Sequence, residues 1–185
     1  MSRTKVAVSA VGGIIACLVT GAAEAQMKAE GQGGVEALAA FLVRAKTQGY
    51  ASGDERRVGA LGDGGREVAF KEGEYAYRDR WYGEQRFSGQ EIVWRLGTAV
   101  WSMNFFGATS SDEPIPPSFT KFHKSALRLV SVESPFRGPA LYREGDLVYV
   151  NDCSGSIREF AGVERIFWRD KEIYRLVYHG GQLQP

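Results

Sequence analysis

Apolar and polar residues follow two different periods along this chain, and the two periods alternate. Over residues 35–45 and again over residues 119–130, apolar side chains recur every three or four positions, which predicts a helix in each segment. Gly49 follows the first segment as a C-terminal cap. The stretch after each helix, most clearly residues 75–81, alternates with the period of two that is typical of strands. The pattern therefore predicts an α+β protein.

Two-residue turns divide the strand stretches into antiparallel strands. In Glu72-Gly73 the glycine supplies the left-handed backbone that such a turn needs, and Leu96-Gly97 is the next tight turn. The register that follows from this second turn places Glu91 opposite Ser102.

An internal repeat organises the chain. Residues 70–77 and 142–149 share the order aromatic, basic, Glu, Gly, acid and then Tyr, at a constant offset of 72 residues. After one inserted residue, an offset of 73 aligns residues 87–107 with residues 160–180. A match of this length with a single gap indicates a duplication.

We therefore expect two αββββ halves, residues 34–107 and 118–181, in a single domain over residues 34–185. The halves are expected to pack about a pseudo-two-fold axis, with both helices on one face of an antiparallel sheet. This is the layout of cystatin-like halves. It also resembles the secreted β-lactamase inhibitor proteins, in which two helix-plus-four-strand repeats form one concave sheet with the help of disulfide bonds.

The first 25 residues have the pattern of a secretory signal peptide. Two basic residues precede an uncharged, mostly apolar run over residues 6–23, and Ala23-Glu24-Ala25 presents small residues where a signal peptidase reads them. Cleavage after Ala25 would give an exported protein, periplasmic or extracellular, with a flexible N-terminal segment over residues 26–33.

A second interpretation of the same region is a bacterial lipobox, Ile14-Ile15-Ala16-Cys17. Cys17 would then be lipidated, and the protein would be anchored in the cell envelope. Cleavage after Ala25 is the favoured interpretation because glycines interrupt the short apolar core that cleavage at Cys17 would leave.

Removal of the signal peptide leaves equal numbers of basic and acidic residues. This balance argues against nucleic acid or an anionic membrane as the main partner, and a membrane is expected only if Cys17 is lipidated. Only Cys153 would remain, so no internal disulfide bond is expected. His123 and His179 are far apart in sequence, and neither a metal site nor a cofactor motif is expected. A monomer is expected.

Four segments of the chain resemble an uncharacterised bacterial family of domains of unknown function. They are residues 34–51, EGEYAYRD at 72–79, FSGQEIVW at 87–94 and YRLVYHGG at 174–181. In some members of that family the domain follows a helix-turn-helix DNA-binding domain, which implies a sensing or regulatory module. This chain has the signal peptide in that place, and the resemblance implies no catalytic residues.

Strand alternation predicts one apolar core face and one face that mixes aromatic, acidic, amide and histidine side chains. A mixed face is typical of a binding surface, although an ordinary half-exposed sheet is the other interpretation. We expect a non-catalytic module that binds a protein or a small molecule there. The candidate residues are Phe87, Glu91, Asn104, Phe106, Glu164, Arg175 and His179.

A hydrolase-like enzyme is the alternative. Glu91 and Glu164 are equivalent in the repeat and would act as paired carboxylates, with His179 as a base. The expected register instead places Glu164 opposite Arg175 as an ordinary ion pair, and no serine or cysteine lies in a nucleophile elbow. A structural protein of the envelope is a third interpretation.

Overall fold

The computed structural model describes residues 31 and 33–184. The expected signal peptide and the lipidation alternative at Cys17 lie outside the described residues. The chain divides into two units, residues 1–37 and 38–185, and all the strands belong to the second. Of the helices in the described part of the chain, none is long and apolar enough to cross a membrane.

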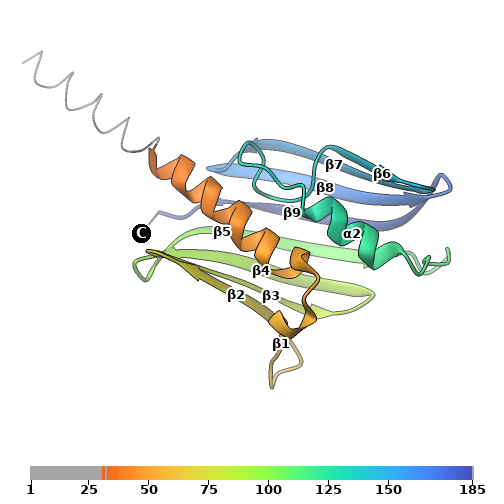
Figure 1. The fold of residues 1–185 in the computed structure, drawn as a ribbon, viewed down its shortest axis with the longest axis horizontal. Helices are drawn as coiled ribbons and strands as arrows, with labels where there is room; N and C mark the ends of the chain where they lie inside the picture. The colour runs from red at the N-terminus through yellow and green to blue at the C-terminus, as the bar shows by residue number, and fades with distance from the viewer. Residues whose placement is uncertain (1–30, 32, 185) are drawn as a thin grey trace, which may run out of the picture. The chain divides into compact units, whose positions relative to one another are not determined.

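Within the described residues, one nine-stranded antiparallel sheet forms the body of the domain (Figure 1). The order across the sheet is β1-β2-β3-β4-β5-β9-β8-β7-β6, so β5 and β9 meet in the middle. The strands are β1 (Gly59–Ala60), β2 (Arg66–Glu72), β3 (Tyr75–Gly83), β4 (Arg86–Arg95), β5 (Thr98–Thr109), β6 (Leu141–Glu144), β7 (Leu147–Ser156), β8 (Glu159–Trp168) and β9 (Lys171–Gln182).

Helices cover one face of this sheet. The N-terminal helix spans residues 33–48, and α2 spans Phe119–Leu127. Within the second unit, residues 38–48 of the N-terminal helix and α2 cross the same side of the strands in Figure 1. The 3-10 turns η1 (Tyr50–Ser52) and η2 (Glu55–Arg57) follow the N-terminal helix. The expected α+β class is confirmed.

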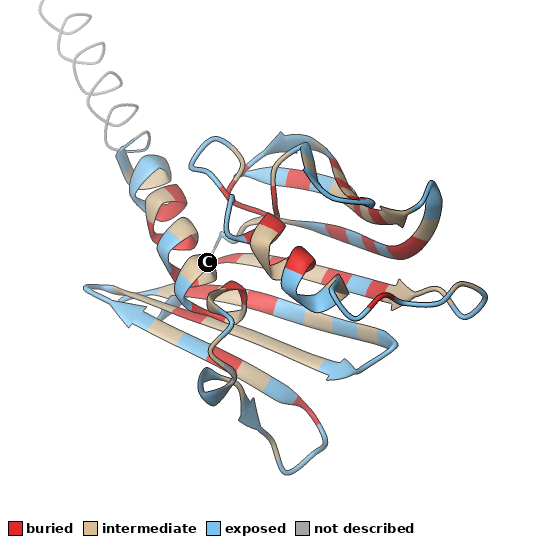
Figure 2. Ribbon diagram, turned by 45° about the vertical axis from the view of Figure 1, so that its right-hand side comes forward, coloured by how far each residue is buried: buried red, intermediate tan, exposed pale blue. Residues whose placement is uncertain are grey.

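The core lies between the helices and the sheet. Phe41 of the N-terminal helix is fully buried and its ring stacks on Tyr75 of β3, with ring centroids 5.0 Å apart. Buried residues alternate along β5, where Trp101 and Met103 face the helices, and along β9, where Leu176 does (Figure 2). Strand alternation correctly predicted this core face.

A β-bulge between β4 and β5 changes the predicted register. The register shifts after Val93, so that Val93 pairs with Trp101 and Glu91 pairs with Met103 rather than with Ser102. A one-residue shift turns a side chain to the opposite face of a sheet. Glu91 therefore lies on the helix-covered face, and its expected place opposite Ser102 is wrong.

A second bulge does the same between β8 and β9. The register shifts after Ile166, so Glu164 pairs with Leu176 and the expected pairing of Glu164 with Arg175 is also wrong. Arg175 instead forms an exposed ion pair with Glu172, at 2.7 Å between Arg175 Nε and Glu172 Oε1.

Candidate functional site

The seven residues predicted to form one binding face lie on two faces. The helix-covered face holds Phe87, Glu91 and Glu164, and the opposite face holds Asn104, Phe106, Arg175 and His179. On the opposite face, Asn104 and His179 are register partners on β5 and β9 and border an open groove of about 810 Å³. The two carboxylates are therefore separated from the histidine by the sheet itself.

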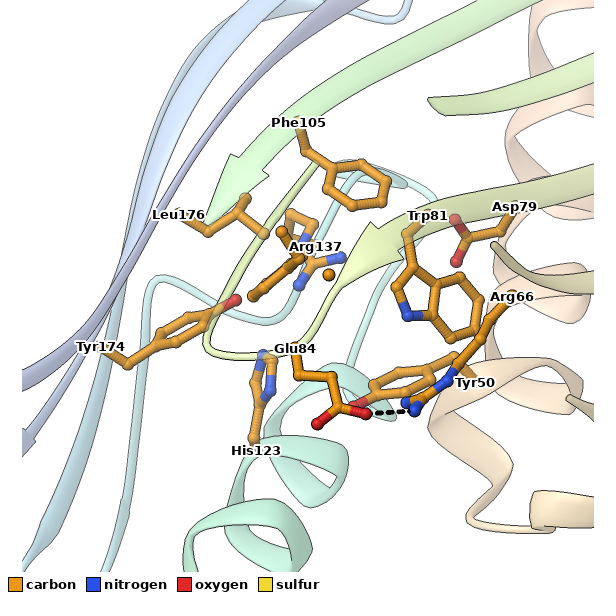
Figure 3. Close-up of a pocket in the computed structure, with 12 residues that line it drawn as sticks. Tyr50, Arg66, Asp79, Trp81, Glu84, Phe105, His123, Arg137, Tyr174 and Leu176 are labelled. Atoms are coloured by element: carbon orange, nitrogen blue, oxygen red, sulfur yellow. Dashed lines mark hydrogen bonds and ion pairs between the residues drawn. The ribbon is translucent and has the colours of Figure 1, made fainter. Parts of the chain in front are cut away.

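A cavity of about 350 Å³ lies over the helix-covered face, at the ends of β3, β4 and β5 (Figure 3). Its aromatic walls are Tyr50, Trp81, Phe87, Phe105 and Tyr174. Its polar groups are Arg66, Asp79, Glu84, His123 and Arg137. These side chains, most of them labelled in Figure 3, come from η1, β2, β3, the turn between β3 and β4, β4, β5, α2, the segment before β6, and β9. A cavity of this size that combines aromatic walls with convergent polar groups is typical of a small-ligand site.

Glu164 binds the side chains that form one side of the cavity. It is fully buried on β8 and takes part in five hydrogen bonds. His123 Nε2 lies 2.8 Å from Glu164 Oε1, Arg137 donates twice at 2.9 Å, and the hydroxyls of Tyr149 and Tyr174 donate at 2.7 and 3.0 Å. Burial raises the pKa of Glu164, but Arg137 and His123 outweigh it and hold that pKa well below its usual value. Glu164 therefore fixes Arg137 and His123 at the cavity wall.

Arg137 presents a free edge to the cavity. Its Nε and Nη2 atoms form a fork on Glu164, which is the strong bidentate arrangement of an arginine and a carboxylate. Burial lowers the pKa of Arg137, but the Glu164 carboxylate raises it by more. The pKa of Arg137 therefore lies well above its ordinary value. Arg137 is therefore a permanent cation whose charge is matched by Glu164.

Glu91 is engaged in a separate ion pair. It is buried on β4 and pairs with Lys46 from the N-terminal helix. Lys46 Nζ also lies 5.7 Å from the centre of the Trp101 ring. Burial lowers the pKa of Lys46, and Glu91 opposes that shift. The carboxylate that the hydrolase alternative requires is thus held by a lysine.

Asp79 is the polar group of the cavity that lacks a partner. It lies on β3 directly opposite Glu91 and two residues from Trp81, on the same face. Its Oδ1 atom is buried and has no hydrogen-bond partner among the described residues. Burial, reinforced by Glu91 and opposed by Lys46 and Arg137, raises the pKa of Asp79 to about 8. Buried polar atoms are nearly always hydrogen-bonded, so this vacancy points to a missing ligand group.

The half of the sheet formed by β6 to β9 holds a counterpart of Asp79 whose hydrogen bonds are made within the protein. Asn151 lies opposite Glu164 as Asp79 lies opposite Glu91. The Tyr178 hydroxyl donates to Asn151 Oδ1 at 2.8 Å, and Asn151 Nδ2 donates to the Gly138 carbonyl at 2.9 Å.

In the half of the sheet formed by β1 to β5, Phe105 stands at the position that Tyr178 has in the other half. Each ring crosses a glycine of the neighbouring strand, Gly89 under Phe105 and Gly162 under Tyr178, with no room for a side chain there. Phe105 has no hydroxyl, and Asp79 consequently lacks the donor that Asn151 has.

The mouth of the cavity carries an exposed ion pair. Arg66 Nη2 and Glu84 Oε1 are 2.5 Å apart, and Glu84 is largely exposed. Such surface pairs contribute little to stability, typically about 0–1 kcal/mol. In the part of the chain that the structure describes, no group of three or more His, Cys, Asp or Glu residues is arranged to hold a metal ion.

Sequence reasoning missed Asp79, His123 and Arg137 as site residues. Asp79 did leave a signal, because it is a carboxylate in the inward-facing row of a strand that is otherwise aromatic at those positions. His123 and Arg137 left none, since each reaches the cavity only through the packing of α2 and the loop that follows it.

The fold and the cavity define a small α+β domain with a partly charged, partly open site on the helix-covered face of its sheet. Residues 79–183 match the family described as a domain of unknown function, DUF5680. The match covers more than half of the chain, and the chain belongs to this family. No curated protein and no solved structure matches it.

Proposed function

We propose that this chain is a small-molecule-binding domain and that its ligand occupies the cavity between Asp79 and Arg137. The observation that carries the proposal is the buried Asp79 Oδ1 atom, which has no partner among the described residues and borders a cavity of about 350 Å³. Small-ligand sites have volumes of roughly 300–1,000 Å³ and combine apolar walls with a few convergent polar groups.

The contacts favour binding over the hydrolase alternative. Glu164 is saturated by His123, Arg137 and two tyrosines, and Glu91 is paired with Lys46, so neither carboxylate is free to transfer a proton. His179 lies on the opposite face. The paired carboxylates and base that the alternative requires do not converge on one reacting atom.

The opposite face of the sheet is the second candidate, for a protein partner. Phe106 and Val177 are register partners on β5 and β9, and each is 50% exposed. Asn104, which is half-buried, and His179, which is exposed, form the register pair two positions along on this face. Aromatic and amide groups together on an exposed sheet favour contact with a partner.

The proposed binding domain is exported, as a monomer, and is not directed at nucleic acid or metal. The support is the signal peptide pattern of residues 1–25 and the balanced charge of the remaining chain. Mass analysis of the exported protein is expected to find Gln26 at the N-terminus. A lipidated Cys17 would support the anchored alternative, and an intact Met1 on a cytoplasmic protein would refute both.

We also propose that the domain arose by duplication of an αββββ unit, with halves at residues 34–107 and 118–181. Support comes from Gly73 and Gly145, which have φ angles of 57° and 58° in equivalent turns, and from the register shifts after Val93 and Ile166. An experimental structure is expected to superpose residues 68–107 on residues 140–180. Different strand orders in the two halves would contradict the duplication.

Ligand binding is tested by NMR with indole N–H signals as reporters. Trp81 borders the cavity, whereas Trp94 packs under Arg78 away from it, with the Arg78 guanidinium 5.1 Å from the ring centre. A fragment library is expected to give hits that shift the Trp81 signal and leave the Trp94 signal in place.

Two matched variants separate the faces. Phe87→Trp fills the cavity and is expected to abolish these shifts, while Phe106→Trp adds the same bulk on the opposite face and leaves them intact. Hits that survive Phe87→Trp and disappear with Phe106→Trp would move the site to the opposite face.

A further inference from the structure

We infer that the ligand of the cavity is an organic cation, an amine with an aromatic or apolar body whose N–H group binds Asp79. This inference rests on the proposed function of the cavity. It begins with the buried charges. Lys46 matches Glu91 and Arg137 matches Glu164, so the two fully buried carboxylates each have a basic partner. Asp79 is left as the carboxyl group of the cavity without a cation.

The Trp81 ring beside Asp79 suits a positive charge, whereas the neighbouring Tyr50 ring already has Lys124 Nζ 5.0 Å from its centre. Tyr50 and Trp81 meet edge to face, with centroids 5.8 Å apart and an interplanar angle of 78°, and both border the cavity. The face of an aromatic ring attracts a cation, most strongly for tryptophan. Figure 3 shows the Trp81 ring next to the Asp79 carboxylate, so one ammonium group could touch both.

The second half of the domain shows what kind of atom is missing. The Tyr178 hydroxyl donates to Asn151 Oδ1 at 2.8 Å, and Phe105 leaves the corresponding position over Asp79 without a donor. A ligand N–H in that place would complete the hydrogen bond. Because Asp79 is a carboxyl group where the other half has an amide, a charged donor gains more there than a neutral one.

An anionic ligand has no comparable partner. Arg137 and Arg66 border the cavity, but Arg137 is already matched by Glu164 through a bidentate fork and Arg66 is paired with Glu84. An anion would also lie beside Asp79 and Glu84, both of which border the cavity. A neutral ligand could satisfy the hydrogen bond to Asp79, but it would leave the carboxyl protonated and would form no ion pair with it.

Proton release is expected to accompany binding of the amine. The titratable and charged groups that face Asp79 are Lys46 from the N-terminal helix, Tyr50 from η1, Tyr77 from β3, Glu91 from β4 and Arg137 from the loop before β6. Burial and Glu91 raise the pKa of Asp79 to about 8, so at pH 7 the free carboxyl is mainly protonated. An ammonium group at van der Waals distance lowers that pKa and expels the proton.

Three probes of one shape test the charge of the ligand: 2-phenylethylamine, 2-phenylethanol and 3-phenylpropionate. Each is titrated by calorimetry into the wild type and into two variants, Asp79→Asn and the exposed control Asp152→Asn. In the wild type the amine is expected to bind at least tenfold more tightly than the alcohol, and the propionate most weakly. Asp79→Asn removes the advantage of the amine, whereas Asp152→Asn keeps it.

The heat of amine binding is measured at pH 7 in two buffers of different ionisation enthalpy, and the difference gives the number of protons released. This number is expected to be close to one in the wild type and zero in Asp79→Asn. Tighter binding of the alcohol or the propionate, or an amine advantage that survives Asp79→Asn, would overturn the cation and leave the cavity as a binding site. If no probe binds and the fragment library also leaves the Trp81 signal unchanged, both the cation and the proposed function are wrong.

Discussion

The Tyr178 hydroxyl on β9 donates a hydrogen bond of 2.8 Å to Asn151 Oδ1 on β7, and this bond links the two strands across β8. In the other half, Phe105 and Asp79 stand at the corresponding places without a hydroxyl between them, and a cavity opens there. One hydroxyl oxygen, present on Tyr178 and absent from Phe105, thus distinguishes the two positions.

Phe105→Tyr is expected to restore this hydrogen bond and stabilise the free protein. A buried hydrogen bond contributes about 1 kcal/mol, which corresponds to a rise in Tm of roughly 2–4 °C for a domain of this size. Urea unfolding and calorimetry measure the change. The reciprocal variant, Tyr178→Phe, leaves Asn151 Oδ1 without its donor and is expected to destabilise the protein by about 1–3 kcal/mol. A destabilised Phe105→Tyr would show that the two positions are not equivalent.

The stability of the wild type is expected to fall as the pH rises from about 4 to about 8. Asp79 has a folded pKa of about 8, raised by burial and by Glu91, whereas the unfolded value is about 4. The folded state therefore holds a proton that the unfolded state has lost, and by linkage the free energy of unfolding decreases across this interval.

Asp79→Asn removes the titrating group behind this decrease. The variant is expected to show a flatter pH profile over this interval and a higher Tm than the wild type at pH 8. Thermal unfolding in a series of buffers measures both. Identical profiles for the two proteins would mean that Asp79 titrates normally in the fold.

Glu164→Gln is expected to destabilise the protein severely. Glu164 is fully buried and balances Arg137, and removal of one partner of a buried ion pair typically costs about 3–5 kcal/mol. Glu172→Gln is the matched control, because Glu172 forms an exposed pair with Arg175 on the same sheet and its loss costs about 0–1 kcal/mol. Equal midpoints of urea unfolding for the two variants would contradict the anchoring role of Glu164.

The two tryptophans that flank the bulge of β4 and β5 are expected to differ in their effect on stability. Trp101 is fully buried and stacks on Phe160 at 5.6 Å, so Trp101→Ala is expected to cost about 3–5 kcal/mol. Trp94 is half-buried under Arg78, and Trp94→Ala is expected to cost clearly less because part of its surface already meets water. Chemical denaturation of both variants measures the difference, and equal losses would place Trp94 in the core.

Local patterns in the sequence determined much of the fold. The period of the apolar residues located both helices, and the alternation along the strands identified the core face. Glycine marked the first tight turn, which the structure places at Gly73-Glu74, one residue later than the predicted Glu72-Gly73. These features depend on neighbours within a few residues, and a linear pattern records them. The pattern could not record the bulge after Val93, because an unpaired residue changes the face of Glu91 without changing the alternation around it.

The candidate site was decided by the tertiary structure. Asp79 is one charged residue in a strand pattern, and its Oδ1 atom has no partner among the described residues because Phe105, at the position equivalent to Tyr178, carries no hydroxyl. His123 and Arg137 join the cavity because both bind Glu164, which the bulge turns inward. The sequence by itself determined the elements and their inward faces. The tertiary structure decided which side chains are buried, which charges are paired and that Asp79 Oδ1 has no partner among the described residues. These properties depend on contacts between segments that are distant in the sequence.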